Sequence, residues 1–266
     1  MRSPHRKTAI AVATAAAVAA AMALSAMASA EIVQKGTLQV SFDGGIAPVR
    51  LPRTEPAPVT VQTDGKVKTT DKSTPPKLER ILLAINANGQ IQTKGLATCS
   101  LGKLESISAA GAQKACSGAL IGHGNVTSRV SLPGQGAFAS NGELSAYNGV
   151  VKGRPAVLAQ VESGAPLPLT YVIVFEVKKA KGTFGTELVG TLPPIASEYG
   201  YISAFDLSLG RTYTYKGEKL SYASASCPAP KGFPGASFPF ARASYEFAGG
   251  ETLTSTIVRE CKVRGK

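Results

Sequence analysis

Histidine and tryptophan are scarce in this chain of 266 residues, and their scarcity excludes several kinds of site. The chain has two histidines and no tryptophan. His5 lies in the first thirty residues, so a Ser-His-Asp or Cys-His arrangement would have to use His123. His123 stands between two glycines, a pattern typical of an exposed turn. We therefore expect no histidine-based catalysis.

Motifs for common catalysts and cofactors are also missing. The sequence has no Gly-x-Ser-x-Gly elbow, no His-Glu-x-x-His and no Cys-x-x-Cys. Gly134-Gln135-Gly136 does not lead into a predicted helix, so it does not predict a phosphate loop. The sequence predicts no cofactor and no metal, and it favours a protein that is not an enzyme.

The 17 acidic residues are scattered, and no pair stands out by local sequence. Two carboxylates could still perform glycosidase chemistry, and Glu143, Glu162, Glu176 and Asp206 lie on or beside predicted strands. Glu176 is predicted on the solvent face of a strand beside Lys178. A carboxylate-based glycan hydrolase is kept as one alternative function.

One long apolar run, Thr8–Leu24, follows the basic residues Arg2, Arg6 and Lys7 and precedes Ala28-Ser29-Ala30. This order predicts a secretory signal peptide, residues 1–30, with cleavage after Ala30. A retained membrane anchor is the alternative, although about 17 residues is the short limit for spanning a bilayer. We expect a secreted or cell-envelope, periplasmic protein without a transmembrane segment after signal removal.

Four cysteines in an exported chain indicate two disulfides. Order and spacing favour Cys99–Cys116 and Cys227–Cys261 among the three possible pairings, because each pair flanks one compact unit. Oxidised cysteines would leave no thiolate nucleophile.

Basic residues outnumber acidic ones, and removal of the leader lowers the formal charge of +12 to about +9. The only dense run is Lys178–Lys181, with a smaller group at the C-terminus (Arg259, Lys262, Arg264 and Lys266). An excess of this sign favours anionic partners, and no nucleic-acid motif is present. We expect anionic envelope polymers or glycans as partners and no nucleic acid; a merely solvated basic surface is the alternative.

Turn signals and β-prone runs organise the rest of the chain. Residues 31–77 are rich in proline and predict an N-terminal arm with an edge hairpin turning at Asp64-Gly65. Residues 78–266 predict an all-β, two-sheet β-sandwich of about 10 to 12 strands. Hairpin turns are predicted at Asn88-Gly89, at Lys216-Gly217 and, between Cys227 and Cys261, at Gly249-Gly250.

The stretch Ser106–Ile121 differs, because it is rich in alanine. It predicts one short helix with Ser108 as the N-cap residue. Tyr213 and Tyr215 would share one face of a strand and could stack a ligand such as a sugar. The lack of tryptophan weakens this hypothesis, and packing of the tyrosines across strands is the alternative.

Several segments resemble a group of exported, β-rich bacterial proteins whose members have no assigned function. These segments are residues 85–89, 94–99, 115–122 and 227–233, within a similarity that covers roughly Pro76 to Val263. The resemblance implies export, a β-rich fold and a disulfide between the flanks of the Ala-rich helix. It brings no catalytic residues.

We therefore expect an exported, non-enzymatic structural or binding protein of the cell envelope or extracellular space. A carrier of an apolar ligand in the sandwich interior is a further alternative. Its signature would be an enclosed cavity with few polar groups.

Overall fold

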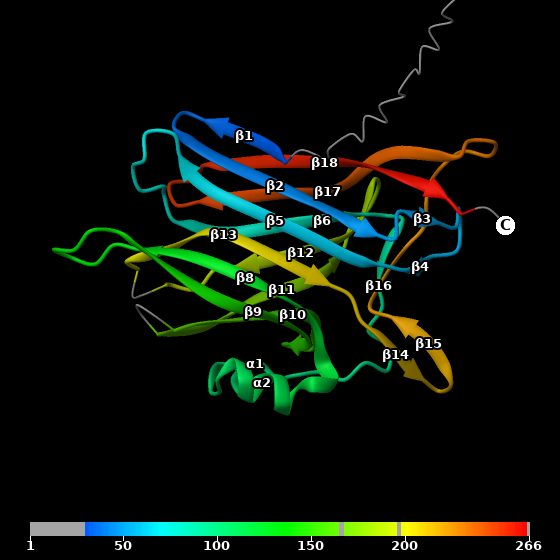
Figure 1. Cartoon of the computed structure of the whole chain (residues 1–266), viewed down its shortest axis with the longest axis horizontal. Coiled ribbons are helices and arrows are strands. Elements are labelled where there is room, and N and C mark those ends of the chain that lie inside the picture. The colour runs from blue at the N-terminus through cyan, green and yellow to red at the C-terminus, as the bar shows by residue number, and fades with distance from the viewer. Residues whose placement is uncertain (1–29, 165–167, 196–197, 265–266) are drawn as a thin grey trace, which may run out of the picture.

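The structure is a computed structural model that describes residues 30–164, 168–195 and 198–264. Most of these residues lie in β-strands, as predicted (Figure 1). Thirteen strands form one sheet, in the order β1-β2-β5-β13-β8-β9-β10-β11-β12-β6-β17-β18-β3. Neighbouring strands are antiparallel, except that β3 runs parallel to β18. The strands of this main sheet are β1 (Glu31–Lys35), β2 (Leu38–Ala47), β3 (Arg50–Leu51), β5 (Thr60–Thr69), β6 (Leu78–Asn86), β8 (Leu120–Val130), β9 (Phe138–Val151), β10 (Arg154–Ser163), β11 (Leu169–Lys179), β12 (Phe184–Thr191), β13 (Gly200–Leu209), β17 (Gly235–Phe247) and β18 (Thr252–Val263).

The main sheet curls until strands from its two edges lie side by side. β18 contacts β1 and β2, along the top of Figure 1. Arg259 on β18 bridges this seam: its Nε donates to the carbonyl oxygen of Gly44 at 2.6 Å, and its guanidinium forms an ion pair with Asp43. The twist between adjacent strands accumulates over a long sheet and makes it coil. In place of the two separate sheets predicted from the sequence, one continuous sheet forms a curled half-barrel.

Apolar residues at alternating positions fill the inside of the curl. On β17, Phe238, Phe240, Ala243, Tyr245 and Phe247 are all buried and belong to the main core. Successive residues of a strand point to opposite faces, and the register of β17 shifts between Pro239 and Ala241. This irregularity adds one residue to the strand, so Phe238 and Phe240 before it and the three residues after it can all face the core. The aromatic run near the C-terminus thus supplies much of the bulk of the core.

Residues 31–77 contribute four strands to the main sheet, β1, β2, β3 and β5. β1 and β2 form a hairpin at its edge, and β5 lies between β2 and β13. The predicted turn at Asp64-Gly65 is wrong, because both residues lie inside β5. A Cβ at Gly65 would stand 2.5 Å from the ring of Phe205. The glycine therefore makes room for an aromatic ring and does not form a turn.

Two short helices and a 3-10 turn pack on the outer face of the main sheet, over β9, β10 and β11 (Figure 1). The predicted N-cap is confirmed, since the Ser108 hydroxyl accepts a hydrogen bond from the N–H of Gly111 at 3.2 Å. Beneath the helices, Leu104, Tyr147 and Leu158 form a second, smaller core. The predicted single helix corresponds to α2, and α1 precedes it. The bounds are α1 (Leu101–Glu105), α2 (Ala109–Ala115) and η1 (Ser117–Ala119).

Both disulfides pair as predicted. Cys99–Cys116 links the residue before α1 to the end of α2, and Cys227–Cys261 links a loop to β18. The predicted hairpin between the second pair is also confirmed, because β17 and β18 are joined through Gly249-Gly250, both at positive φ. Glycine adopts this left-handed conformation without steric penalty.

A three-stranded sheet, β4-β16-β7, and a hairpin, β14–β15, lie at the end of the main sheet where β18 ends, on the right of Figure 1. The hairpin turn at Lys216-Gly217 is confirmed. The hairpin predicted at Asn88-Gly89 is wrong: the chain leaves β6 there, but β7 pairs with β16 instead of returning along β6. The bounds are β4 (Ala57–Pro58), β7 (Gly89–Ile91), β14 (Thr212–Tyr215), β15 (Glu218–Ser221) and β16 (Ala223–Ala225).

The predicted signal peptide lies, apart from Ala30, outside the described residues. β1 begins at Glu31, the residue that follows the predicted cleavage site. Within the described part of the chain, no helix is both long and apolar enough to cross a membrane.

Candidate functional site

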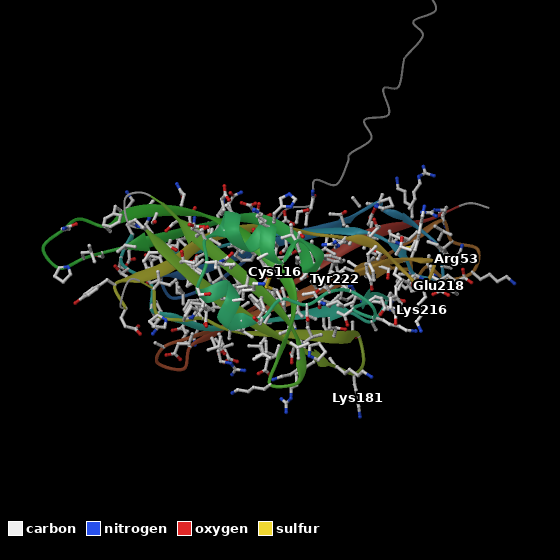
Figure 2. All side chains as sticks on the ribbon, turned by 90° about the horizontal axis from the view of Figure 1, so that it is seen from below. Arg53, Cys116, Lys181, Lys216, Glu218 and Tyr222 are labelled. Atoms are coloured by element: carbon white, nitrogen blue, oxygen red, sulfur yellow. A yellow bond between two sulfur atoms is a disulfide. The ribbon has the colours of Figure 1, made fainter. Side chains whose placement is uncertain are left out.

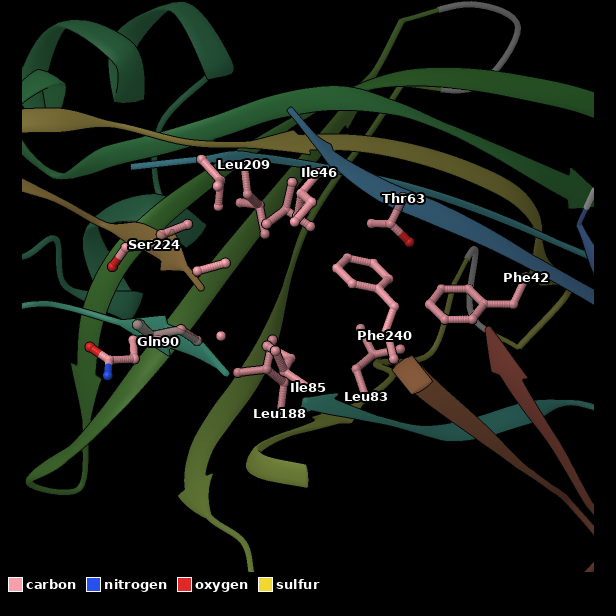
Figure 3. Close-up of a pocket in the computed structure, with 17 residues that line it drawn as sticks. Phe42, Ile46, Thr63, Leu83, Ile85, Gln90, Leu188, Leu209, Ser224 and Phe240 are labelled. Carbon is pink, nitrogen blue, oxygen red and sulfur yellow. The ribbon is translucent and has the colours of Figure 1, made fainter. Parts of the chain in front are cut away.

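Two adjoining cavities lie inside the curled sheet. The first, of about 100 Å³, is walled by β2, β5, β6 and β17 and by the three-stranded sheet (Figure 3). The second, of about 80 Å³, lies among β8, β10, β11 and β13. Both are lined by Thr63, Leu83, Leu188 and Leu209. The two cavities are therefore neighbours, and we refer to them together as the hollow.

Small inward-facing side chains help to leave this hollow open. Ala159 on β10 lines the second cavity, and Ala241 on β17 lines the first together with Ala223 and Ala225 of the three-stranded sheet. Protein interiors are ordinarily packed as densely as organic crystals. An apolar hollow of this kind is therefore a candidate ligand site.

The lining of the hollow is almost wholly apolar. Among the described residues, the polar ones that line it are Thr63, Gln90 and Ser224. The Thr63 hydroxyl already donates to the carbonyl oxygen of Asp43 at 3.1 Å. No Asp, Glu, Lys, Arg or His of the described chain lines either cavity. The hollow suits an uncharged apolar guest and offers no general acid or base.

The two tyrosines predicted to stack a ligand lie on β14 and pack against the chain around Gly95. The Tyr213 hydroxyl donates to the carbonyl oxygens of Gln92 and Lys94, at 3.3 and 2.9 Å. The Tyr215 ring lies so close to Gly95 that a Cβ there would be 2.1 Å from it. Both rings therefore hold a loop in place, and ligand stacking stays a prediction.

The predicted catalytic candidates lie on the outside of the sheet. His123 is exposed within β8, not in a turn, and its cross-strand neighbours are Ser145 and Ser208. The predicted pairing of Glu176 with Lys178 is confirmed, with their charged groups 3.5 Å apart. No described residue places a carboxylate beside His123 in an ion pair.

A row of five carboxylates and one amide crosses the outer face, with one residue on each of six neighbouring strands directly opposite the next. Partial burial, followed by the carboxylate of Asp43, raises the pKa of Asp64 above its ordinary value. At the far end, Glu162 accepts a hydrogen bond from the N–H of Ala109 at the start of α2. Within the described residues, no group of three or more His, Cys, Asp or Glu side chains is placed to hold a metal ion. The row consists of Asp43, Asp64, Asp206, Asn125, Glu143 and Glu162.

Basic residues gather where β18 ends. We call this surface the basic end and define it by Arg50, Arg53, Lys231, Lys262 and Arg264. β18 carries Lys262 opposite Arg50 of β3, and the loop before β17 carries Lys231. Arg53 lies at this end of the molecule in Figure 2. The sequence already grouped Lys262 and Arg264 at the C-terminus, and strand pairing adds Arg50 to them.

An open groove of about 570 Å³ runs across the basic end. Arg50, Lys262, Phe233 and Glu260 are among the residues that line it. Phe233 is the most exposed large apolar side chain of the described residues, with 61 % of its surface accessible. The molecule thus has two separate candidate sites, an apolar interior and a basic, aromatic exterior.

Comparison with known proteins gives no assignment for either site. No protein-family model, no curated protein and no solved structure matches the chain.

Proposed function

We propose that the protein is an exported, non-enzymatic binding protein that holds an apolar ligand inside the curled sheet. The observation that supports this most directly is the hollow with almost no polar lining. The facing parts of the curled sheet would enclose the ligand as the two layers of a sandwich do. The resemblance to exported β-rich bacterial proteins agrees with this proposal.

Export is supported by the two disulfides, which persist in oxidising compartments. A basic, Ala-rich leader ending where β1 begins agrees with a signal peptide. The proposed location is the extracellular space or the cell envelope.

The dimensions of the hollow limit the ligand. Apolar cavities of about 150 Å³ stay dry and bind molecules the size of benzene. Two smaller, adjoining cavities would suit one narrow chain, such as an alkyl or acyl chain, better than a bulky ring system. The chemistry offered by the lining is apolar contact alone.

The alternative of a glycan hydrolase has less support. Glu143 and Glu162 are cross-strand neighbours, but they stand on the outer face, and Glu162 accepts a hydrogen bond at the start of α2. Glu176 is accompanied by two cations, Lys178 and Arg154. Glycoside hydrolysis needs two carboxylates that flank the substrate, and no described Asp or Glu lines either cavity of the hollow.

Isothermal titration calorimetry with 1-alkanols and fatty acids of increasing length tests the proposal. Ala159→Leu fills the second cavity, and Ala139→Leu on the exposed side of β9 is the matched control. We expect saturable binding by the wild type and the control and at least tenfold weaker binding by Ala159→Leu. Circular dichroism verifies that both variants fold. Equal binding by Ala159→Leu and the wild type, or no binding by either, would contradict the proposal.

A further inference from the structure

The basic end concentrates unpaired positive charge. Lys262 stands opposite Arg50, and the N–H of Arg264 donates to the carbonyl oxygen of Leu51. Among the described residues, none of the five cations of the basic end takes part in a salt bridge. Like charges on neighbouring strands repel each other. An anion bound here would relieve that repulsion.

The loop of the basic end presents Phe233 on a fixed backbone. The Arg53 guanidinium donates to the carbonyl oxygens of Ala229, Pro230 and Phe233, at 2.7, 2.5 and 2.6 Å. The N–H of Val263 donates to the carbonyl oxygen of Pro234. The Cys227–Cys261 disulfide anchors the loop from its other side. Because the backbone is already held, burying the ring in a partner requires little loss of conformational freedom.

A single exposed aromatic residue is unremarkable by itself. Here it protrudes beside a groove whose walls include Arg50 and Lys262. Aromatic side chains with lysine and arginine around them are the combination found at membrane–water interfaces, where the ring enters the acyl boundary and the cations meet anionic headgroups.

We propose that the basic end docks on an anionic phospholipid surface, with its cations over the phosphates and Phe233 in the interface. The geometry favours a bilayer over a soluble polyanion. Single-stranded nucleic acids need several rings for successive bases, and the basic end presents one large exposed ring. An anionic glycan would contact the cations and could stack one sugar on Phe233, but only a bilayer brings acyl chains to this ring, and the experiments below distinguish the two.

This proposal goes beyond ligand binding in the interior and does not depend on it. A protein with an empty interior would still dock, and a protein with a filled interior need not dock. The two sets of experiments therefore fail separately.

The absence of tryptophan makes a direct test possible. Phe233→Trp places the sole tryptophan of the chain at the tip of the proposed docking loop. Tyr199→Trp is the matched control, because Tyr199 is also exposed (48 %) and precedes β13 at the opposite end of the main sheet. Each variant is mixed with vesicles of phosphatidylcholine alone or with phosphatidylglycerol, and far-ultraviolet circular dichroism confirms folding.

We expect Phe233→Trp to show blue-shifted fluorescence, quenched by brominated acyl chains, with the phosphatidylglycerol vesicles only. Tyr199→Trp should show neither change. An equal response of the two variants, or no response of Phe233→Trp, would overturn the proposal. So would an equal response to vesicles of phosphatidylcholine alone.

Vesicle sedimentation tests the cations. One lysine or arginine near an anionic surface corresponds to about fivefold in binding, so Arg50→Gln with Lys262→Gln should weaken binding about 25-fold. Lys68→Gln with Arg129→Gln, which removes two exposed cations from the opposite end, should have little effect. The protein could instead bind soluble polyphosphate, with the same dependence on Arg50 and Lys262, while tryptophan at position 233 shows no response to vesicles. This result would identify a polyanion site and refute the lipid surface.

Discussion

Removal of the two disulfides should destabilise the protein unequally, because they close loops of different length. Cys227 and Cys261 are 34 residues apart, and Cys99 and Cys116 are 17 apart. In the loop-closure model, a cross-link of the longer span lowers the entropy of the unfolded chain by the equivalent of about 4 kcal/mol, and one of the shorter span by about 3 kcal/mol. The double variants Cys227→Ala/Cys261→Ala and Cys99→Ala/Cys116→Ala measure each contribution.

The choice of alanine isolates this difference. All four cysteines are buried, so each double variant leaves voids of similar size in the folded state. That part of the destabilisation is shared and largely cancels between the variants. The longer-loop variant should therefore be the less stable one by up to about 1 kcal/mol.

Urea unfolding followed by far-ultraviolet circular dichroism gives the free energies of unfolding, without a reductant. Wild-type protein with reductant is a third arm and should be less stable than either variant. Alkylation of the denatured, unreduced wild type should label none of the four sulfurs. Labelled cysteines, or a larger loss in Cys99→Ala/Cys116→Ala than in the other pair, would refute the reasoning.

Three further substitutions test single contacts. Folding raises the pKa of Asp64, so the folded state loses stability as pH rises through that pKa. Asp64→Asn should therefore raise the free energy of unfolding by about 0.5 kcal/mol at pH 7, after allowance for solvent screening, and leave it unchanged at pH 3. Urea titrations at the two pH values measure this difference. Arg259→Met leaves Asp43 without its cation and should lower the free energy of unfolding of the protein by about 1–3 kcal/mol. Adding Asp43→Asn to this variant should recover part of the loss. If the effects of the two substitutions on the free energy of unfolding are simply additive, the ion pair does not contribute. Gly95→Ala should lower the melting temperature more than Gly36→Ala. Both glycines have positive φ, but only a Cβ at position 95 would meet the Tyr215 ring. Equal shifts of the melting temperature in the two variants would exclude that contact.

The features that the sequence predicted correctly depend on neighbouring residues. The turns at Lys216-Gly217 and Gly249-Gly250 need positive φ, which glycine supplies locally. Ser108 caps the helix that begins at the next residue, through the N–H of Gly111, and each disulfide flanks a compact unit.

The features that the sequence predicted wrongly or missed depend on strands that are far apart in the chain. Asp64-Gly65 carries the same local signal as a true hairpin turn, but the ring of Phe205 on β13 decides its structure. The acidic row becomes visible only when the register of six strands is known. The hollow likewise depends on small residues of distant strands, Ala159 in one cavity and Ala241 in the other, whose placement composition cannot show.

The interior and the basic end are joined by a short stretch of chain. Ala223 and Ala225 line the first cavity, and the chain then reaches Cys227, which is bonded to Cys261 beside Lys262. The first cavity thus lies at the same end of the sheet as the docking loop. If both proposals hold, an apolar guest leaving a docked bilayer has its shortest path into this end.

Arg50→Gln with Lys262→Gln should therefore slow the transfer of a fatty acid from phosphatidylglycerol vesicles about 25-fold while leaving its binding from free solution unchanged. Ala159→Leu should weaken both kinds of loading at least tenfold and leave docking intact. Equal transfer rates in the wild type and the charge variant would show that the two surfaces work independently.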